Sequence, residues 1–104
     1  MRCEVGMSTT PEGKVKLRVK KILKDVGAYY AMPATGGYGV SGVPDFLVCF
    51  KGKFIGIETK SGSNKTTELQ KRNLAEIELA GGLSIVVNEG NIDELERILN
   101  EYKN

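Results

Sequence analysis

The sequence contains no histidine and only two cysteines among its 104 residues. Without histidine, the chain cannot form Ser-His or Cys-His nucleophilic pairs or a His-ligated zinc site, and it lacks the commonest general base. Cys3 and Cys49 form neither a disulfide framework nor a metal-ligand spacing, and we expect Cys49, inside an apolar run, to be a small buried side chain. Any catalysis must therefore use carboxylates, lysine, tyrosine or metal-bound water.

Long hydrophobic runs are also missing. No stretch approaches the roughly 18 consecutive apolar residues of a membrane-spanning helix, and the N-terminus lacks the basic and then apolar order of a signal peptide. These absences predict a soluble, intracellular protein without membrane contact. The net charge of +2 is too small to identify a nucleic-acid binder on its own. The length favours a single domain over 1–104, with its core over about 11–88.

Hydrophobic periodicity and capping residues predict the secondary structure. We expect helices over 11–26, 67–80 and 91–102, the first opened by Thr10 and closed by Gly27, the second opened by Thr66 or Thr67. We expect strands over 29–32, 45–50, 53–60 and 83–87, with a tight hairpin turn at 51–52. The order α-β-β-β-α-β-α predicts an α/β fold, a mixed β-sheet flanked by helices, in which the last helix only covers the core.

The hairpin places three charged residues together. A two-residue turn at 51–52 brings Asp45 directly opposite Glu58, and Lys60, two residues later, points to the same face. Facing carboxylates are destabilising unless a cation compensates them, and hard oxygen ligands without histidine suit Mg²⁺ or Mn²⁺. The alternative is an ordinary surface triad in which Lys60 neutralises the two acids.

Two further polar residues lie on apolar helix faces. Glu12 shares a face with Val15 and is expected to point toward the sheet, although an acid in a first helical turn is also favourable by itself. Gln70 lies on the apolar arc of Leu74 and Ile77, where its amide must find a partner, and holding Lys60 or a water fits this position. The alternative for Gln70 is an amide bonded to backbone or solvent.

The ordered set of these residues carries a family resemblance. Glu12, then Gly42-Val43-Pro44-Asp45, then Glu58-Thr59-Lys60, then Gln70 match in order the helix glutamate, the G-x-P-D element, the E-x-K element and the helix glutamine of one family. Over about 11–87 the sequence resembles the virus-type replication-repair nuclease (VRR-NUC) family of the PD-(D/E)xK superfamily, in a minimal stand-alone form.

The resemblance implies a restriction-endonuclease-like core and metal-dependent hydrolysis of DNA. Asp45 and Glu58 would bind Mg²⁺, for which Mn²⁺ can substitute, together with the backbone carbonyl of Thr59. Lys60 would orient or deprotonate the attacking water. The catalytic set implied in this way is Glu12, Asp45, Glu58, Lys60 and Gln70. Small viral-type nucleases that look similar act as homodimers on four-way (Holliday) junctions, which makes branched DNA the expected partner and the cytoplasm of a bacterial host the expected location if a phage encodes the chain.

Basic and glycine-rich segments are candidate contacts to DNA. A run of lysines and arginine on the first helix is commonly a solvated face, but beside a nuclease site it gains weight as a phosphate-contacting surface. The glycine-rich loop could approach the DNA backbone closely, or could be a plain surface connection. The expected DNA-binding residues are Lys14, Arg18, Lys21, Gly37, Gly39, Ser41 and Lys65.

Three other functions remain open at this point. A nuclease of the same fold could cut flaps, nicks or a defined sequence, and a catalytically silent module could bind DNA without turnover. The stretch 37–42 also satisfies the G-x-G-x-x-G dinucleotide fingerprint, but Pro44 and a strand follow it instead of a helix. We therefore expect no nucleotide cofactor.

Overall fold

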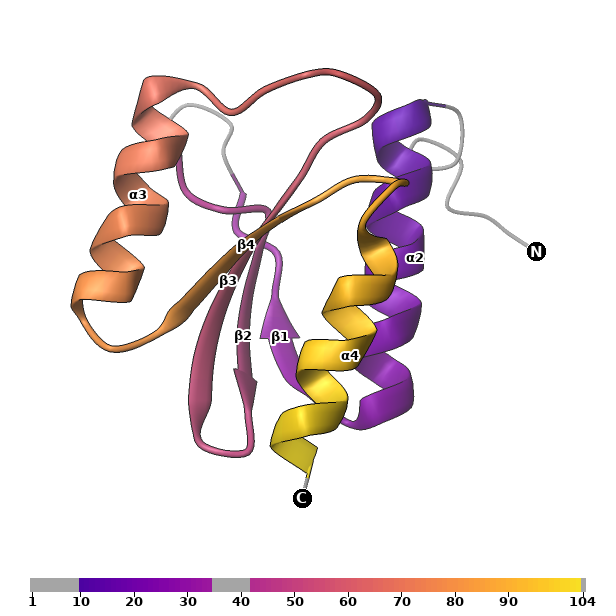
Figure 1. The fold of residues 1–104 in the computed structure, drawn as a ribbon, viewed down its shortest axis with the longest axis vertical. Helices are drawn as coiled ribbons and strands as arrows, with labels where there is room; N and C mark the ends of the chain where they lie inside the picture. The colour runs from indigo at the N-terminus through magenta and orange to yellow at the C-terminus, as the bar shows by residue number, and fades with distance from the viewer. Residues whose placement is uncertain (1–9, 35–41, 104) are drawn as a thin grey trace.

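The computed structural model describes residues 10–34 and 42–103, and its elements follow the expected order (Figure 1). Gly37, Gly39 and Ser41 lie outside the described residues. The elements are α2 (Pro11–Val26), β1 (Tyr29–Ala31), β2 (Phe46–Phe50), β3 (Lys53–Thr59), α3 (Glu68–Leu79), β4 (Leu83–Val87) and α4 (Ile92–Lys103). The α/β class and the order α-β-β-β-α-β-α are confirmed.

The first helix begins and ends where its capping residues predict. The Thr10 side chain accepts a 2.9 Å hydrogen bond from the backbone N–H of Gly13, and Pro11 occupies the first helical position, where no N–H is needed. Gly27 ends the helix with φ 81°, a left-handed conformation that glycine adopts without steric cost.

The four strands form one mixed sheet in the order β1-β2-β3-β4. β1, β2 and β3 are antiparallel neighbours, whereas β4 runs parallel to β3 after the crossover through α3. Lys51 and Gly52 form the hairpin turn with φ 52° and 79°, so Phe50 pairs with Lys53 as expected. The ladder ends at Phe46 opposite Ile57, which leaves Asp45 one residue before β2.

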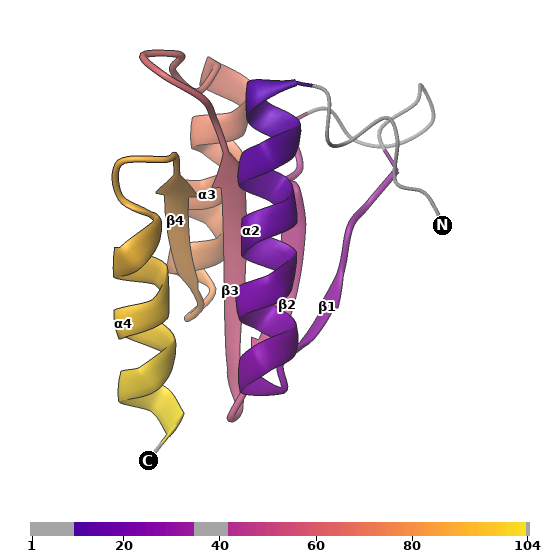
Figure 2. The same cartoon turned by 90° about the vertical axis from the view of Figure 1, so that its right-hand side faces the viewer.

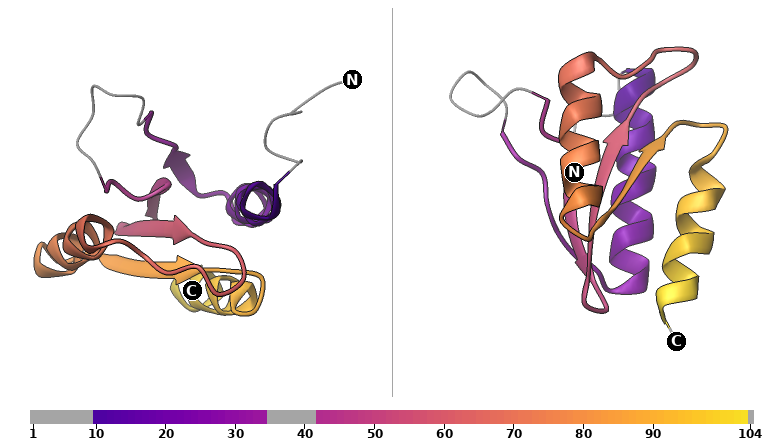
Figure 3. Two further views of the ribbon diagram at one scale, coloured as in Figure 1. Left: turned by 90° about the horizontal axis from the view of Figure 1, so that it is seen from above. Right: turned by 60° about the vertical axis from the view of Figure 1, so that its left-hand side comes forward.

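Helices cover the two faces of this sheet unequally. α2 and α4 lie on one side and α3 on the other, as Figures 2 and 3 show. The core lies on the α2 and α4 side, where strand residues such as Phe46, Val48 and Ile57 are buried against Val19 and Leu95. On the opposite side, α3 contacts β3 and β4. No helix in the described ranges is long and apolar enough to cross a membrane.

The expectation that Cys49 is buried is wrong. Its neighbours Val48 and Phe50 face the core, so strand alternation turns Cys49 to the opposite face, where its side chain is exposed. The apolar run around Cys49 suggested burial, but only alternate residues of β2 face the core.

Candidate active site

Glu58 lies next to last in β3 and is only 3% exposed. Burial first, and then the negative charge of Asp45, raise the pKa of Glu58 from 4.5 to about 7, although the Lys60 ammonium acts in the opposite direction. A cation that enters the site would stabilise the charged form of this carboxyl group. The perturbed pKa of a buried acid beside a second acid and a lysine is typical of functional sites.

The two oxygens of Glu58 have different surroundings. Oε2 accepts a 2.9 Å hydrogen bond from the side-chain amide of Gln70 and lies 3.6 Å from Nζ of Lys60. Oε1 is buried and has no hydrogen-bond partner among the described residues. A buried carboxylate oxygen without a partner is costly, so this atom requires an explanation.

Asp45 approaches the same end of the sheet from the start of β2. Its Oδ2 accepts hydrogen bonds from both the backbone N–H and the hydroxyl of Thr59, the residue that follows Glu58. Its Oδ1 lies 3.8 Å from Nζ of Lys16 on α2. The register predicted that Asp45 and Glu58 would converge; the structure adds that Thr59 holds one oxygen of Asp45 and leaves the other turned toward α2.

Gln70 fills both roles that its position in the sequence left open, an amide bonded to the backbone and an amide that faces the site. Its carbonyl oxygen accepts from the backbone N–H of Thr67, completing a capping box at the start of α3, while its amide donates to Glu58. The helix cap therefore fixes the side chain that holds the buried acid. The site contact of Gln70 is made to Glu58, whereas Lys60 or a water was the expected partner.

Glu12 and Lys16 form the α2 border of the site. The Glu12 side chain is 35% exposed, and its Oε2 lies 3.6 Å from Nζ of Lys16. The inward direction predicted for Glu12 therefore brings its side chain only to the rim of the site. Lys16 bridges Glu12 and Asp45, and it was not among the site residues predicted from the sequence. Its spacing of four residues from Glu12 was the available signal, because such residues are neighbours on a helix.

Gly42 positions the segment that leads to Asp45. It has φ 85°, and a Cβ there would lie 2.7 Å from the backbone carbon and oxygen of Leu69 and 2.9 Å from Nδ2 of Asn73. The chain thus passes directly over the backbone of α3, three residues before Asp45. Only glycine combines this φ with this close approach.

The oxygen donors fit a divalent cation of the Mg²⁺ type. No group of three or more acidic, histidine or cysteine side chains within 10–34 and 42–103 is arranged to hold a metal. Mg²⁺, however, typically takes one or two carboxylates and completes its coordination with waters and substrate phosphate. Asp45 Oδ1 and Glu58 Oε1, which has no hydrogen-bond partner within the described part of the chain, supply two hard oxygens of this kind.

The expected DNA-contacting side chains that the structure describes lie at the surface. Lys14 and Arg18 are exposed on α2, and Lys65 is exposed in the connection between β3 and α3. Lys21 is 78% exposed and lies 3.3 Å from Asp25 on the same helix. None of the four takes part in the Glu58 and Asp45 contacts described above.

Comparison with known proteins gives one informative result. No family model and no curated protein sequence matches this chain. A solved structure described as a VRR_NUC domain matches it with a TM-score of 0.73 and 26% sequence identity, covering 86% of this chain and 97% of that chain. The chain has the fold of a VRR_NUC domain.

This likeness confirms the restriction-endonuclease-like core that the sequence predicted. A VRR_NUC fold with converging carboxylates supports a nuclease of the PD-(D/E)xK type, which binds DNA.

Proposed function

We propose that the chain is a Mg²⁺-dependent DNA endonuclease, with Mn²⁺ as an acceptable substitute, and that Asp45 and Glu58 hold the metal. The observation that carries this proposal is Oε1 of Glu58, which is buried and has no partner in the ranges 10–34 and 42–103, on a carboxylate whose other oxygen is held by Gln70 and Lys60. The backbone carbonyl of Thr59 is the third protein ligand that we propose, because Thr59 lies between Glu58 and Lys60 and contacts Asp45.

The chemistry is hydrolysis of a phosphodiester bond. Bound Mg²⁺ supplies a Lewis acid that offsets charge developing on the phosphate oxygens. Lys60, 13% exposed and beside Glu58, places an ammonium where it can orient an attacking water. In-line attack of water breaks the bond between phosphorus and the 3′ oxygen, leaving a 5′ phosphate and a 3′ hydroxyl.

The neighbouring residues act by orientation and charge. Gln70 holds Oε2 of Glu58, so that Oε1 would be left to bind the metal. Glu12, at the rim, restrains Lys16 through its ion pair, and Lys16 neutralises part of the negative charge that two carboxylates concentrate in one place. These residues preorganise the site before substrate arrives.

Contacts to DNA come from the surrounding basic residues. Lys14, Arg18 and Lys21 on α2 and Lys65 after β3 provide charge for phosphate contacts, and Gly37, Gly39 and Ser41 belong to the segment that we assign to close approach of the backbone. Phosphate contacts of this kind give affinity without sequence preference and weaken as salt rises.

The substrate that we propose is branched DNA, in particular a four-way junction cut by a homodimer inside the cell. Two cuts on opposed strands need two active sites, and one chain of 104 residues offers one Asp45 and Glu58 pair. Flaps, nicks or a defined sequence are the other substrates for the same site, and profiling separates them.

The test is cleavage of end-labelled four-way junction, flap, nicked, single-stranded and linear duplex DNA with Mg²⁺, with EDTA and with Glu58→Ala as controls. Paired symmetric cuts in the junction that both controls abolish support the full proposal. Metal-dependent cuts restricted to another substrate overturn the junction assignment alone. Absence of metal-dependent cutting on every substrate overturns the enzyme proposal and leaves a DNA-binding module.

A further inference from the structure

A hollow in the surface of α2 is lined mainly by lysine, and we call it the α2 hollow. It has a volume of about 350 Å³ and is lined by Leu17, Lys20, Lys21, Lys24 and Asp25. Lys21 lies 3.3 Å from Asp25, so the acid of the hollow is already engaged. No acid within 10–34 and 42–103 forms an ion pair with Lys20 or Lys24. The α2 hollow therefore holds two ammonium groups whose charge no described neighbour offsets.

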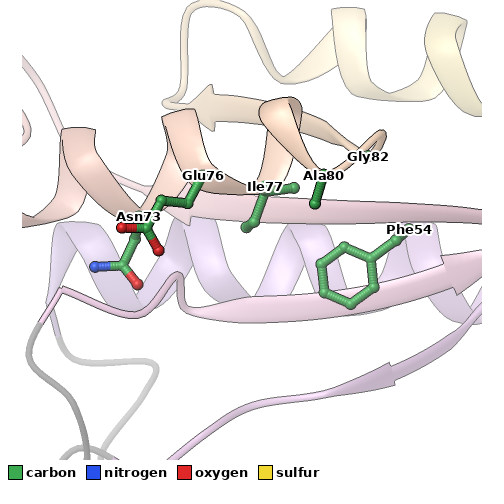
Figure 4. Close-up of a pocket in the computed structure, with 6 residues that line it drawn as sticks. All are labelled: Phe54, Asn73, Glu76, Ile77, Ala80 and Gly82. Carbon is green, nitrogen blue, oxygen red and sulfur yellow. The ribbon is translucent and has the colours of Figure 1, made fainter.

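A groove of similar size but different chemistry lies between α3 and β3 (Figure 4). Its volume is about 400 Å³, and it is lined by Phe54, Asn73, Glu76, Ile77, Ala80 and Gly82. The charged member of this lining is the carboxylate of Glu76, which repels an anion. Of these two hollows, the α2 hollow has the charge to bind an anion.

The α2 hollow continues a row of lysines that begins at the active site. Lys16, whose Nζ lies 3.8 Å from Oδ1 of Asp45, is followed by Lys20 and Lys24 at intervals of four residues, which places them along one side of the helix. Figure 2 shows α2 running along the sheet from the end where β3 terminates. Each interval advances about 6 Å along the helix axis, so Lys24 lies about 12 Å beyond Lys16.

We propose that the α2 hollow binds a backbone phosphate of DNA, about three or four phosphates from the scissile one, so that the strand leaves the active site along α2. The distance follows because the phosphates of one strand succeed each other every 3.4 Å or so of the DNA axis, and the row of lysines spans about 12 Å. The identity of the anion rests on the proposed function. Lys20 and Lys24 thus add a contact that Lys14 and Arg18, which form a separate row on α2, do not supply.

The chemistry of the hollow suits a phosphodiester. Lysine ammonium groups are compact point charges, which bind phosphate oxygens without a fixed orientation. Leu17 is half-buried among the lysines, and lysine stems can cover such apolar surface while their ammonium groups stay in water. Lys20 and Lys24 are also four residues apart, where like charges destabilise a helix. A bound phosphate would remove this repulsion.

The test measures DNA binding without metal, so that no cleavage intervenes. Fluorescence anisotropy of a labelled four-way junction and a labelled linear duplex, in EDTA and over a series of NaCl concentrations, gives the slope of log Kd against log salt. Lys20→Met and Lys24→Met should each reduce this slope by about 0.9, the value for one lost phosphate contact. Methionine keeps a long unbranched side chain and a high helix propensity.

Two variants control for net charge and for folding. Lys103→Met makes the same change of charge at an exposed position on α4 and should leave the slope unchanged. Lys24→Arg keeps the charge in the hollow and should keep the wild-type slope. Circular dichroism of every variant should match the wild-type spectrum.

Neutral phosphate analogues test the path of the strand. In a DNA that the protein cuts, a single methylphosphonate replaces one phosphate at a time on either side of the cut. Affinity should fall about two- to fivefold for the analogue about three or four phosphates from the cut, on one side only. The same analogue should have no effect on a chain that carries both Lys20→Met and Lys24→Met, because the contact is already lost.

The outcomes separate this proposal from the nuclease function. Unchanged slopes in Lys20→Met and Lys24→Met, an equal change in Lys103→Met, or a wild-type chain that binds neither DNA would overturn the α2 hollow as a phosphate site. Analogue effects confined to other phosphates would overturn the path along α2. Reduced slopes without metal-dependent cleavage would leave the hollow standing and refute the nuclease function, whereas cleavage with unchanged slopes would do the reverse.

Discussion

Gln70 donates a 2.9 Å hydrogen bond to Oε2 of Glu58, and the other oxygen of that carboxylate has no partner among the described residues. The same amide side chain closes the capping box at the start of α3. A structural cap and the orientation of a buried acid therefore depend on one residue. This coupling makes it possible to separate stability from activity by choosing which of the bonded partners to change.

Replacing Thr67 and Gln70 should separate the two effects. Thr67→Ala removes the hydroxyl that accepts from the N–H of Gln70 and should cost about 1 kcal/mol of unfolding free energy, with cleavage retained. Gln70→Ala should cost a similar amount and also lower kcat for DNA cleavage by about 10- to 100-fold, because Glu58 loses its orienting bond. Urea unfolding and single-turnover cleavage measure the two quantities. Equal losses of kcat in both variants would refute the orienting role.

The stability of the metal-free protein should depend on pH through Glu58. The folded state keeps the Glu58 proton up to a pKa of about 7, whereas the unfolded chain releases it near 4.5. Between these values the folded state binds more protons, so the unfolding free energy should fall as pH rises from about 4.5 through 7, by about 1–3 kcal/mol.

Urea unfolding in EDTA at intervals between pH 4.5 and 8 measures this slope. The Glu58→Gln variant cannot ionise at this position, so its unfolding free energy should lack this fall between pH 4.5 and 8. At pH 8 the variant should therefore be more stable than the wild type. Curves that run parallel at all pH values would show that Glu58 titrates normally in the folded state.

Much of this site follows from local rules. Lys51 and Gly52 both adopt the positive φ of a tight turn, which fixes the register and brings Asp45 and Glu58 to one end of the sheet. Alternation then places Lys60 beside Glu58, 3.6 Å away. Each of these steps depends on neighbours in the sequence or on one hairpin, and for this reason the sequence was sufficient to predict them.

Other features depend on packing between distant elements. Lys16 was one lysine in a basic run, and only the placement of α2 against the sheet decides that it, and not Lys14 or Lys21, reaches Asp45. Cys49 was expected to be buried because its apolar neighbours do not reveal which sheet face a helix covers. The partner of Gln70 was likewise decided by where the start of α3 lies.

Removing the charge of Lys16 should strengthen metal binding. Its ammonium lies 3.8 Å from Oδ1 of Asp45, so it competes with a cation for that oxygen. We expect Lys16→Met to raise the affinity for Mn²⁺ about three- to tenfold, an effect limited by solvent because Lys16 is partly exposed. Lys24→Met, an exposed position two turns further along α2, is the control and should change the affinity less. Calorimetric titration of the DNA-free protein with Mn²⁺ measures the affinity of both variants. Equal gains in the two variants would show that net charge alone causes the gain.

Gly42 should tolerate no side chain, unlike glycines in open loops. Gly42→Ala combines a left-handed φ of 85° with a Cβ only 2.7 Å from the Leu69 backbone, so it must push the segment before Asp45 away from α3. We expect a loss of about 2–4 kcal/mol in unfolding free energy, from backbone strain and overpacking together.

Gly62→Ala is the matched control, since Gly62 has φ 57° and open space around it and should lose only about 1 kcal/mol. Urea unfolding of both variants measures the difference, and Mn²⁺ affinity should fall for Gly42→Ala alone because Asp45 is displaced. If the two variants lost equal stability, the close approach to α3 would contribute nothing and only the backbone conformation would matter at Gly42.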